Sequence, residues 1–132
     1  LTVRDEDKDA LVPIAEELCD LGFTLFATPG TADVLRSSNV EVTTVYRINE
    51  RKHPDALDLM RRGDISFIVN VPTVSGGAVR DGNMMRRLAV ELNIPFVTTI
   101  RGARMETAAI RALIEKDIVP RKLEVHYDSK FL

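Results

Sequence analysis

Cysteine is almost absent from this sequence, since Cys19 is the only one among 132 residues. A single cysteine excludes an internal disulfide bond and fits a reducing compartment, so we expect a cytoplasmic protein. Cys19 lies at helical spacing from Ile14, Leu18 and Leu21, which indicates a small core residue rather than a nucleophile. No apolar run approaches the span of a bilayer, and no signal-peptide pattern is present. The first residue is Leu1 rather than methionine, which suggests a processed chain or a piece of a longer one.

Charge of one sign and metal-ligand patterns are also lacking. The formal net charge is −2, which gives no electrostatic attraction to nucleic acid or to an anionic membrane. The two histidines, His53 and His126, are far apart in the sequence and Cys19 stands alone, so we expect no metal site. The glycines at Gly76 and Gly77 form neither a Walker loop nor a dinucleotide fingerprint.

No residue lies in a catalytic sequence pattern. Three carboxylates, Asp55, Asp58 and Asp81, are candidates for a general base by residue type alone. None of them has a neighbouring motif that would make it one. The sequence therefore predicts no catalytic residue.

The sequence does contain alternating strand and helix patterns. Its length suits one domain, residues 1–132, with a core of its own. Alternation of this kind predicts an α/β fold in which a parallel sheet carries helices on both faces. We expect strands near residues 1–3, 23–27, 40–46, 65–69 and 94–100, with a further one at 123–125. We expect helices at 10–21, 31–39, 56–62, 83–92 and 103–116.

Three of these helices have apolar positions that we expect to face the core. The methionines at helical spacing are expected to be core residues for the same reason. The predicted positions are Leu57, Leu59 and Met60; Met84, Leu88 and Leu92; and Met105, Ala108, Ala109, Ala112 and Leu113.

The stretch 23–32 predicts a strand, a tight turn and a helix N-terminus. Pro29 disfavours helical geometry at Thr28, and Gly30 lets a ligand approach the backbone. The first helical turn has N–H groups without intrahelical partners and carries partial positive charge. With the hydroxyls of Thr28 and Thr31, this predicts a cradle for a phosphate or a carboxylate. The alternative is a helix that threonine simply caps.

Four loops follow strands of the predicted parallel sheet, where ligands bind in such folds. Lysine and arginine beside a helix N-terminus favour an anion, and a phosphate monoester fits best. Asp81 could accept hydrogen bonds from a ribose or a base, or Asp81 or Asn83 could cap the following helix. The polar residues that these loops offer are Lys8, Thr28, Thr31, Arg47, Lys52, Asn70, Thr73, Ser75 and Asp81.

Seven short stretches carry a family resemblance when they are taken in order. They are Leu-Thr-Val-Arg-x-x-Asp-Lys (1–8), Glu-Leu-Cys-Asp-Leu-Gly-Phe (17–23), Ala-Thr-Pro-Gly-Thr-Ala (27–32), Ile-Val-Asn-x-Pro (68–72), Arg-Asp-Gly (80–82), Met-Arg-Arg-Leu-Ala-Val (85–90) and Ile-Pro-Phe-Val-Thr-Thr (94–99). Together they resemble the methylglyoxal-synthase-like domain, and more closely the C-terminal allosteric domain of the carbamoyl-phosphate synthase large subunit. The resemblance runs from Leu1 to about Leu113.

The resemblance implies a three-layer, Rossmann-like sandwich around a five-stranded parallel sheet. It implies binding of uridine or inosine monophosphate, or of phosphate, without a cofactor in this domain. The rest of the large subunit, which uses ATP with Mg or Mn, and the glutaminase small subunit would be its partners in pyrimidine and arginine synthesis. The matching phosphate positions are Thr2, Lys8, Thr28, Gly30, Thr31 and Arg47. At the position of Arg47 the family more often has lysine. The matching nucleoside positions are Asn70, Thr73 and Asp81.

Two other readings remain open at this point. Methylglyoxal synthase, a lyase acting on dihydroxyacetone phosphate, shares the scaffold, but its Gly-Gly-Asp-Gln-Gln segment is replaced here by residues 49–55. A free-standing sensor or an interaction module with a vestigial cleft is the third reading. Ornithine activation is not expected, because Phe96 and Val97 depart from the family's Tyr-Asp-Thr.

Overall fold

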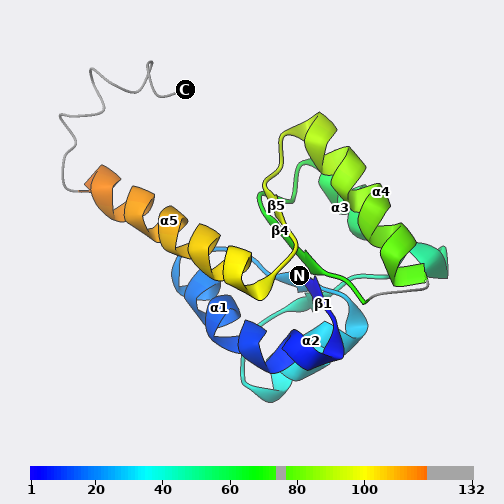
Figure 1. The fold of residues 1–132 in the computed structure, drawn as a ribbon, viewed down its shortest axis with the longest axis horizontal. Helices are drawn as coiled ribbons and strands as arrows, with labels where there is room; N and C mark the ends of the chain where they lie inside the picture. The colour runs from blue at the N-terminus through cyan, green and yellow to red at the C-terminus, as the bar shows by residue number, and fades with distance from the viewer. Residues whose placement is uncertain (74–76, 119–132) are drawn as a thin grey trace.

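The computed structural model describes residues 1–73 and 77–118. Five short strands alternate with five α-helices and two 3-10 turns along this part of the chain (Figure 1). The strand expected at 123–125, His126, Ser75 and Gly76 lie outside the described residues. The elements, in order, are β1 (Thr2–Val3), η1 (Asp5–Asp7), α1 (Lys8–Asp20), β2 (Phe26–Ala27), α2 (Pro29–Ser37), β3 (Thr43–Thr44), η2 (Ile48–Glu50), α3 (Ala56–Arg62), β4 (Ile68–Val71), α4 (Gly77–Leu92), β5 (Phe96–Val97) and α5 (Ile100–Ile118).

The strands pair in parallel but form two sheets rather than one. β1, β4 and β5 make a three-stranded sheet in the order β1-β4-β5, and β2 and β3 make a separate pair. The prediction of a single five-stranded sheet is therefore wrong, although the α/β class is confirmed. β1 is two residues long, and the main-chain hydrogen bonds that connect this segment to the β2 segment are made by Leu1, the residue before β1. The nitrogen of Leu1 donates to the carbonyl of Phe26 at 2.7 Å, and the N–H of Thr28 donates to the carbonyl of Leu1 at 3.3 Å.

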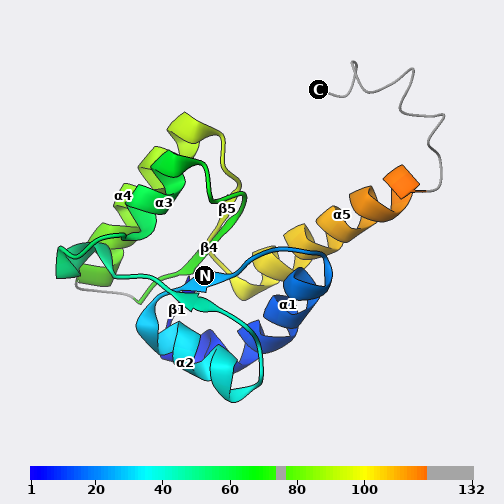
Figure 2. The ribbon, with the colours of Figure 1, turned by 180° about the vertical axis from the view of Figure 1, so that it is seen from behind.

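Helices cover both faces of the strands. α1, α2 and α5 lie together on one side, and α3 and α4 lie together on the other (Figures 1 and 2). Neighbouring residues of β4 point to opposite sides, as the two-residue period of a strand requires. Val69 belongs to the cluster around α1 and α2, and Ile68 belongs to the cluster around α3 and α4. A strand that is apolar on both faces is typical of a central parallel strand.

The face that α5 buries differs from the predicted one. Ala103 and Thr107 are fully buried, and the hydroxyl of Thr107 donates to the carbonyl of Ala103 at 2.7 Å. Met105 and Leu113 are instead 64% and 63% exposed, and the alanines predicted with them are exposed too. Two stripes of small and apolar residues run along this helix, and periodicity alone cannot say which one packs against α1.

The face of α4 is displaced in the same way. Met85 and Ala89 are buried and Leu88 is half-buried, whereas Met84 and Leu92 are exposed. The expected inward face of α3 is confirmed, since its two leucines and Met60 are buried. Of the four methionines, therefore, two are core residues and two are not. None of the described helices has both the length and the apolar character needed to cross a bilayer.

α4 begins at Gly77, six residues earlier than the sequence predicts. Gly82 therefore lies inside the helix, where glycine is ordinarily unfavourable. The reason is a close tertiary contact: a Cβ built on Gly82 would lie 2.5 Å from Nδ2 of Asn70. Glycine at this position lets α4 approach β4. Asp81 and Asn83 consequently lie within the helix, and neither caps it.

Candidate functional site

A cavity of about 270 Å³ opens where the chain leaves β1, β2 and β4. It is bordered by the turn before α1, the start of α2, the segment before η2 and the first turns of α4. Eight of the nine predicted site residues line it. These eight are Thr2, Lys8, Thr28, Thr31, Arg47, Asn70, Thr73 and Asp81. Gly30 lies beside the cavity under Lys8 and Arg47.

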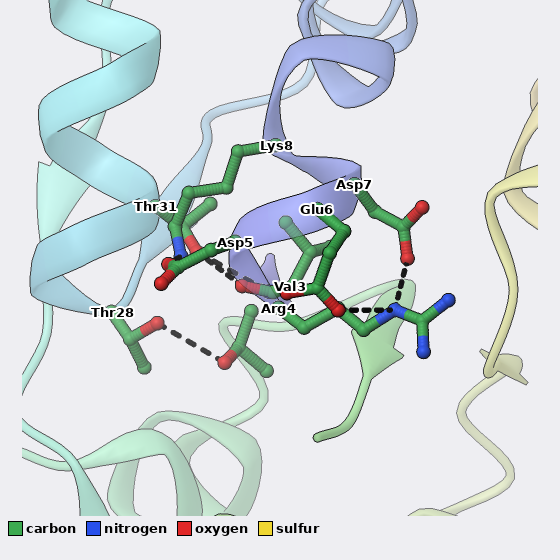
Figure 3. Close-up of polar contacts among 9 residues, drawn as sticks. Val3, Arg4, Asp5, Glu6, Asp7, Lys8, Thr28 and Thr31 are labelled. Atoms are coloured by element: carbon green, nitrogen blue, oxygen red, sulfur yellow. Dashed lines mark hydrogen bonds and ion pairs between the residues drawn. The ribbon is translucent and has the colours of Figure 1, made fainter. Parts of the chain in front are cut away.

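The N-terminus of α2 faces this cavity without a capping side chain. Thr28 is extended, with φ −67° and ψ 158°, and its side chain makes no capping hydrogen bond. Its hydroxyl donates instead to Oγ1 of Thr2 at 3.1 Å (Figure 3). Pro29 has no N–H, so the N–H groups of Gly30 and Thr31 form the positive end of the helix. The alternative of a helix capped by its threonine side chain is therefore not what forms here.

Thr31 has a structural role that the sequence did not reveal. Its side chain is buried, and its oxygen accepts the N–H of Val3 at 3.2 Å. The same hydroxyl lies 3.4 Å from the carbonyl of Val3, to which it donates (Figure 3). The hydroxyl of Thr31 thus joins α2 to β1, and what this residue offers the cavity is its backbone N–H.

Lys8 and Arg47 converge over Gly30. A Cβ built on Gly30 would lie 3.6 Å from Nζ of Lys8 and 3.8 Å from Nη2 of Arg47. Gly30 does not have a positive φ, in contrast to Gly22 and Gly63. The reason for glycine here is thus the close approach of two cationic side chains rather than an unusual backbone angle. Two positive charges and the end of a helix dipole meet at one point.

Acidic residues of η1 balance these charges. The carboxylate of Asp5 pairs with the ammonium of Lys8 (Figure 3). This hydrogen bond, and the charges of Lys8 and Arg47, hold the pKa of Asp5 below its usual value. The side chain of Lys8 is only 12% exposed, whereas that of Asp5 is 91% exposed. This pair was not predicted from the sequence, although its i, i+3 spacing at a helix start is a recognisable signal.

Arg4 is a second residue of the cavity that was not predicted from the sequence. Its Nε donates to the carboxylate of Asp7 at 2.6 Å and lies 3.7 Å from that of Glu6 (Figure 3). The hydrogen bond to Asp7 raises the pKa of Arg4 above its usual value. Lys52, which the sequence offered as a cation for this edge, instead lies 5.6 Å from the ring centroid of Tyr46 and does not line the cavity.

Polar groups form the opposite wall of the cavity. Asn70 is buried at the end of β4, directly against Gly82 of α4. The carboxylate of Asp81 accepts the N–H of Asn49 at 3.3 Å, which holds η2 against α4. Thr73 follows β4 and is exposed. Cations thus lie on the α2 side of the cavity, and an amide and a carboxylate lie on the α4 side.

The carboxylates of Asp55 and Asp58 lie together with His53, away from the cavity wall. Their ligand atoms are within 4.8 Å of one another, but hydrogen bonds at the start of α3 account for the grouping. Asp55 and Asp58 each accept the other's backbone N–H, at 3.0 and 2.9 Å. Nδ1 of His53 lies 2.6 Å from Asp58, and this contact raises the pKa of His53. The cluster is therefore a helix cap with a histidine beside it.

Comparison with known proteins identifies the family. A family model described as the MGS-like domain matches residues 10–98. A carbamoyl phosphate synthase large chain, C-terminal section, from Methanopyrus kandleri is 42% identical over 89% of this chain and 22% of its own length. The corresponding section from Methanocaldococcus jannaschii is 44% identical over 86% of this chain and 18% of its own.

A carbamoyl phosphate synthase large chain from Synechocystis is also similar, at 36% identity over 94% of this chain and 11% of its own length. The chain thus spans less than a quarter of each of these relatives. The match to the family model covers more than half of the chain, and the parallel α/β arrangement agrees with it. The chain belongs to the family of MGS-like domains.

Proposed function

We propose that this chain is the regulatory, nucleotide-binding domain of a carbamoyl-phosphate synthase large chain and is not catalytic by itself. The proposed ligand is a nucleoside monophosphate of the uridine or inosine type, with inorganic phosphate as its minimal form. The proposed partners are the remainder of the large chain and its glutaminase subunit. Support comes from the family, from the names of the relatives and from the chemistry of the cavity.

One observation carries the proposal: Lys8 and Arg47 converge over Gly30 at the uncapped start of α2. A phosphate placed there accepts hydrogen bonds from the N–H groups of Gly30 and Thr31. Arg47 can bind it through two parallel hydrogen bonds, and Lys8 supplies a point charge. Each of these contacts favours a dianion over a neutral ligand.

The rest of the cavity fits a nucleoside. Asn70 offers both a donor and an acceptor, and Asp81 offers acceptors for ribose hydroxyls or for the edge of a base. The volume of about 270 Å³ lies just below the range of roughly 300–1,000 Å³ that is usual for small-molecule sites. This size favours a monophosphate over a longer polyphosphate.

Calorimetric titration of the chain with uridine monophosphate, inosine monophosphate, phosphate and dihydroxyacetone phosphate tests the proposal. We expect a nucleotide to bind more tightly than phosphate, and Lys8→Met to weaken binding of both. The matched control is Lys52→Met, which removes a lysine that does not line the cavity and should leave the affinity unchanged. Equal affinities for the wild-type chain and Lys8→Met would contradict the phosphate site.

The lyase that shares this scaffold is kept as an alternative, because three carboxylates, Asp5, Glu6 and Asp81, line the same cavity. A proton-abstracting enzyme requires a carboxylate in its cleft. Here Asp5 is engaged by Lys8, and Asp81 by Asn49. Release of phosphate from dihydroxyacetone phosphate, abolished by Asp81→Asn but not by Asp64→Asn, would establish the lyase and overturn the regulatory function.

Regulation itself is a property of the longer protein. An effector shifts an equilibrium between two states only by its difference in affinity for them, typically about 1–3 kcal/mol. The test is the rate of carbamoyl phosphate formation by the whole synthase with and without nucleotide. Lys8→Met should remove the response to nucleotide and leave the basal rate unchanged.

A further inference from the structure

Tyr46 brings an aromatic ring to the cavity that the phosphate site opens into. Among the described residues that line this cavity, it is the one aromatic residue. It is 40% exposed, so a large apolar surface is left in contact with solvent. A tyrosine side chain has only two torsions to fix, and a ligand can therefore use its ring at a low cost in conformational entropy.

The main chain on both sides of Tyr46 is held in place. The N–H of Val45 donates to a carbonyl of β2 at 2.9 Å, and that of Arg47 donates to the carboxylate of Glu50 at 2.6 Å. Tyr46 itself pairs in parallel with Asp55, which caps α3. The fold therefore places the Cα atom of Tyr46 at the cavity independently of a ligand.

Lys52 contacts the ring of Tyr46 from outside the cavity. The Nζ atom of Lys52 is 5.6 Å from the ring centroid, which is a cation–π distance. Tyr46 lines the cavity and Lys52 does not, so the ring lies between the lysine and the cavity. One face of the ring is thus covered by a cation, and the other face is available to a ligand.

The ring begins one residue away from a side chain of the proposed phosphate site. Arg47, the next residue, reaches Gly30 with its guanidinium group. Side chains of consecutive residues in an extended segment point to opposite sides, so the ring of Tyr46 diverges from this guanidinium. A ligand that contacts both needs a spacer between its anionic part and its flat part. The ribose of a nucleoside monophosphate is such a spacer.

Apolar side chains extend the surface that the ring provides. Three of them line the cavity as well, namely Ile48, Ala56 and Met85. Ala56 directly follows Asp55, the residue that pairs with Tyr46, so the two cavity residues come from adjacent main-chain segments. This wall fits the apolar face of a base, whereas the amide and carboxylate groups elsewhere in the cavity fit its polar edge.

We propose that the base of a nucleoside monophosphate stacks on Tyr46 and that this contact selects an aromatic phosphate ester over aliphatic phosphate esters. The inference rests on the proposed function, because it takes the phosphate site at Gly30 as given. Stacking requires a π-face on the ligand, which ribose 5-phosphate and dihydroxyacetone phosphate lack. The cations and the N-terminus of α2 attract the phosphate of all these esters, so the ring adds discrimination that the phosphate site cannot supply.

Calorimetric titration with uridine monophosphate, inosine monophosphate and ribose 5-phosphate tests the role of the ring. Tyr46→Leu keeps an apolar side chain and removes the ring, whereas Tyr46→Phe keeps the ring. We expect Tyr46→Leu to weaken nucleotide binding by about tenfold and to leave the affinity for ribose 5-phosphate unchanged. Tyr46→Phe should bind nucleotide like the wild-type chain. Lys52→Met, which leaves the ring in place, is the matched control.

Tyrosine fluorescence gives a readout that a merely structural role of Tyr46 would not change. The sequence contains two tyrosines and no tryptophan, and the second tyrosine, Tyr127, lies outside the described residues. A base stacked on a tyrosine ring quenches its emission. We expect nucleotide, but not ribose 5-phosphate, to quench the emission of the wild-type chain and of Tyr127→Phe. Tyr46→Phe, which removes only a hydroxyl group, should bind nucleotide without this quenching.

The outcomes separate this inference from the function on which it rests. Unchanged nucleotide affinity of Tyr46→Leu, or quenching that persists in Tyr46→Phe, would overturn the role of Tyr46 and leave the phosphate site intact. Equal weakening of nucleotide and ribose 5-phosphate binding by Tyr46→Leu would also overturn it, because the residue would then shape the cavity rather than hold a base. A wild-type chain that binds no nucleotide would overturn both proposals before any variant is compared.

Discussion

The carboxylate of Asp5 holds the ammonium of Lys8 at the mouth of the ligand cavity. Asp5 is therefore an intramolecular anion at the place proposed for a phosphate. Its side chain is almost fully exposed, so moving it into solvent costs little. The affinity of the cavity for an external anion is thus the outcome of a competition between two anions for one lysine.

Asp5→Asn should tighten phosphate binding, because the amide no longer competes for Lys8. An exposed pair of this kind contributes little, so we expect at most a severalfold decrease in Kd by calorimetry. Asp9→Asn, which removes an exposed carboxylate from the first turn of α1, is the matched control. Weaker binding by Asp5→Asn would mean that Asp5 positions Lys8 rather than competing for the ligand.

Thr31→Val should destabilise the fold but spare the proposed phosphate site. Valine keeps the shape of threonine but leaves the N–H and carbonyl of Val3 without the buried hydroxyl that now bonds both. An unsatisfied buried group costs about 1–3 kcal/mol, which urea denaturation would measure. Thr43→Val, on an exposed strand position, is the control. A large loss of phosphate affinity at unchanged stability would show that the hydroxyl binds ligand directly.

Gly82→Ala should destabilise the protein although alanine is the better helix former. The new Cβ would meet Nδ2 of the buried Asn70 at 2.5 Å, and overpacking costs about 1–3 kcal/mol. The gain in helix propensity returns at most about 1 kcal/mol. In Gly77→Ala the Cβ meets the exposed side chain of Asn49 instead, and that side chain can move away.

Comparing the stabilities of Gly82→Ala and Gly77→Ala therefore isolates the steric effect of the Cβ on Asn70 better than either substitution alone. Urea midpoints should fall for Gly82→Ala and stay near the wild-type value for Gly77→Ala. Gly82→Ala should also weaken nucleotide binding more than phosphate binding, because Asn70 lies on the nucleoside side of the cavity. Equal stability of the two variants would show that Asn70 can move without cost.

His53 should contribute stability that is lost on raising the pH. Its contact with Asp58 raises its pKa in the folded protein above the usual 6.5. The contribution is therefore fully present below pH 6.5 and disappears as the pH rises through the folded-state pKa. Thermal midpoints of the wild-type chain minus those of His53→Gln, measured from pH 5 to 9, should decrease with pH. A difference that is constant across this range would contradict the charged contact.

Local patterns were sufficient to predict much of the fold. The strand-turn-helix at Thr28 and Pro29 follows from backbone restrictions that need no tertiary information. The cation pair was also within reach, because Lys8 and Arg47 follow different strands of a parallel sheet and such loops meet at one edge. That the two side chains converge over Gly30 is visible only in the structure.

Tertiary contacts decided what the sequence could not. The predicted helix begins only after Gly82, yet Gly82 lies inside α4, and glycine is required there because Asn70 leaves no room for a Cβ. In α5, Met105 and Thr107 both belong to plausible faces, and packing against α1 selected the one with threonine. Thr31 illustrates the same limit at the site, because a hydroxyl that serves a ligand and one that serves the main chain of Val3 have the same sequence signature.

The position of the cavity between two separately packed halves has a mechanical consequence. Thr28 and Lys8 belong to the half built on α1 and α2, and Asp81 belongs to the half built on α3 and α4. A ligand that contacts both halves at once would restrain their relative movement and would fix the tilt of α4 relative to α2. Under the proposed function, a neighbouring domain of the longer protein would then sense ligand occupancy as a change in helix orientation.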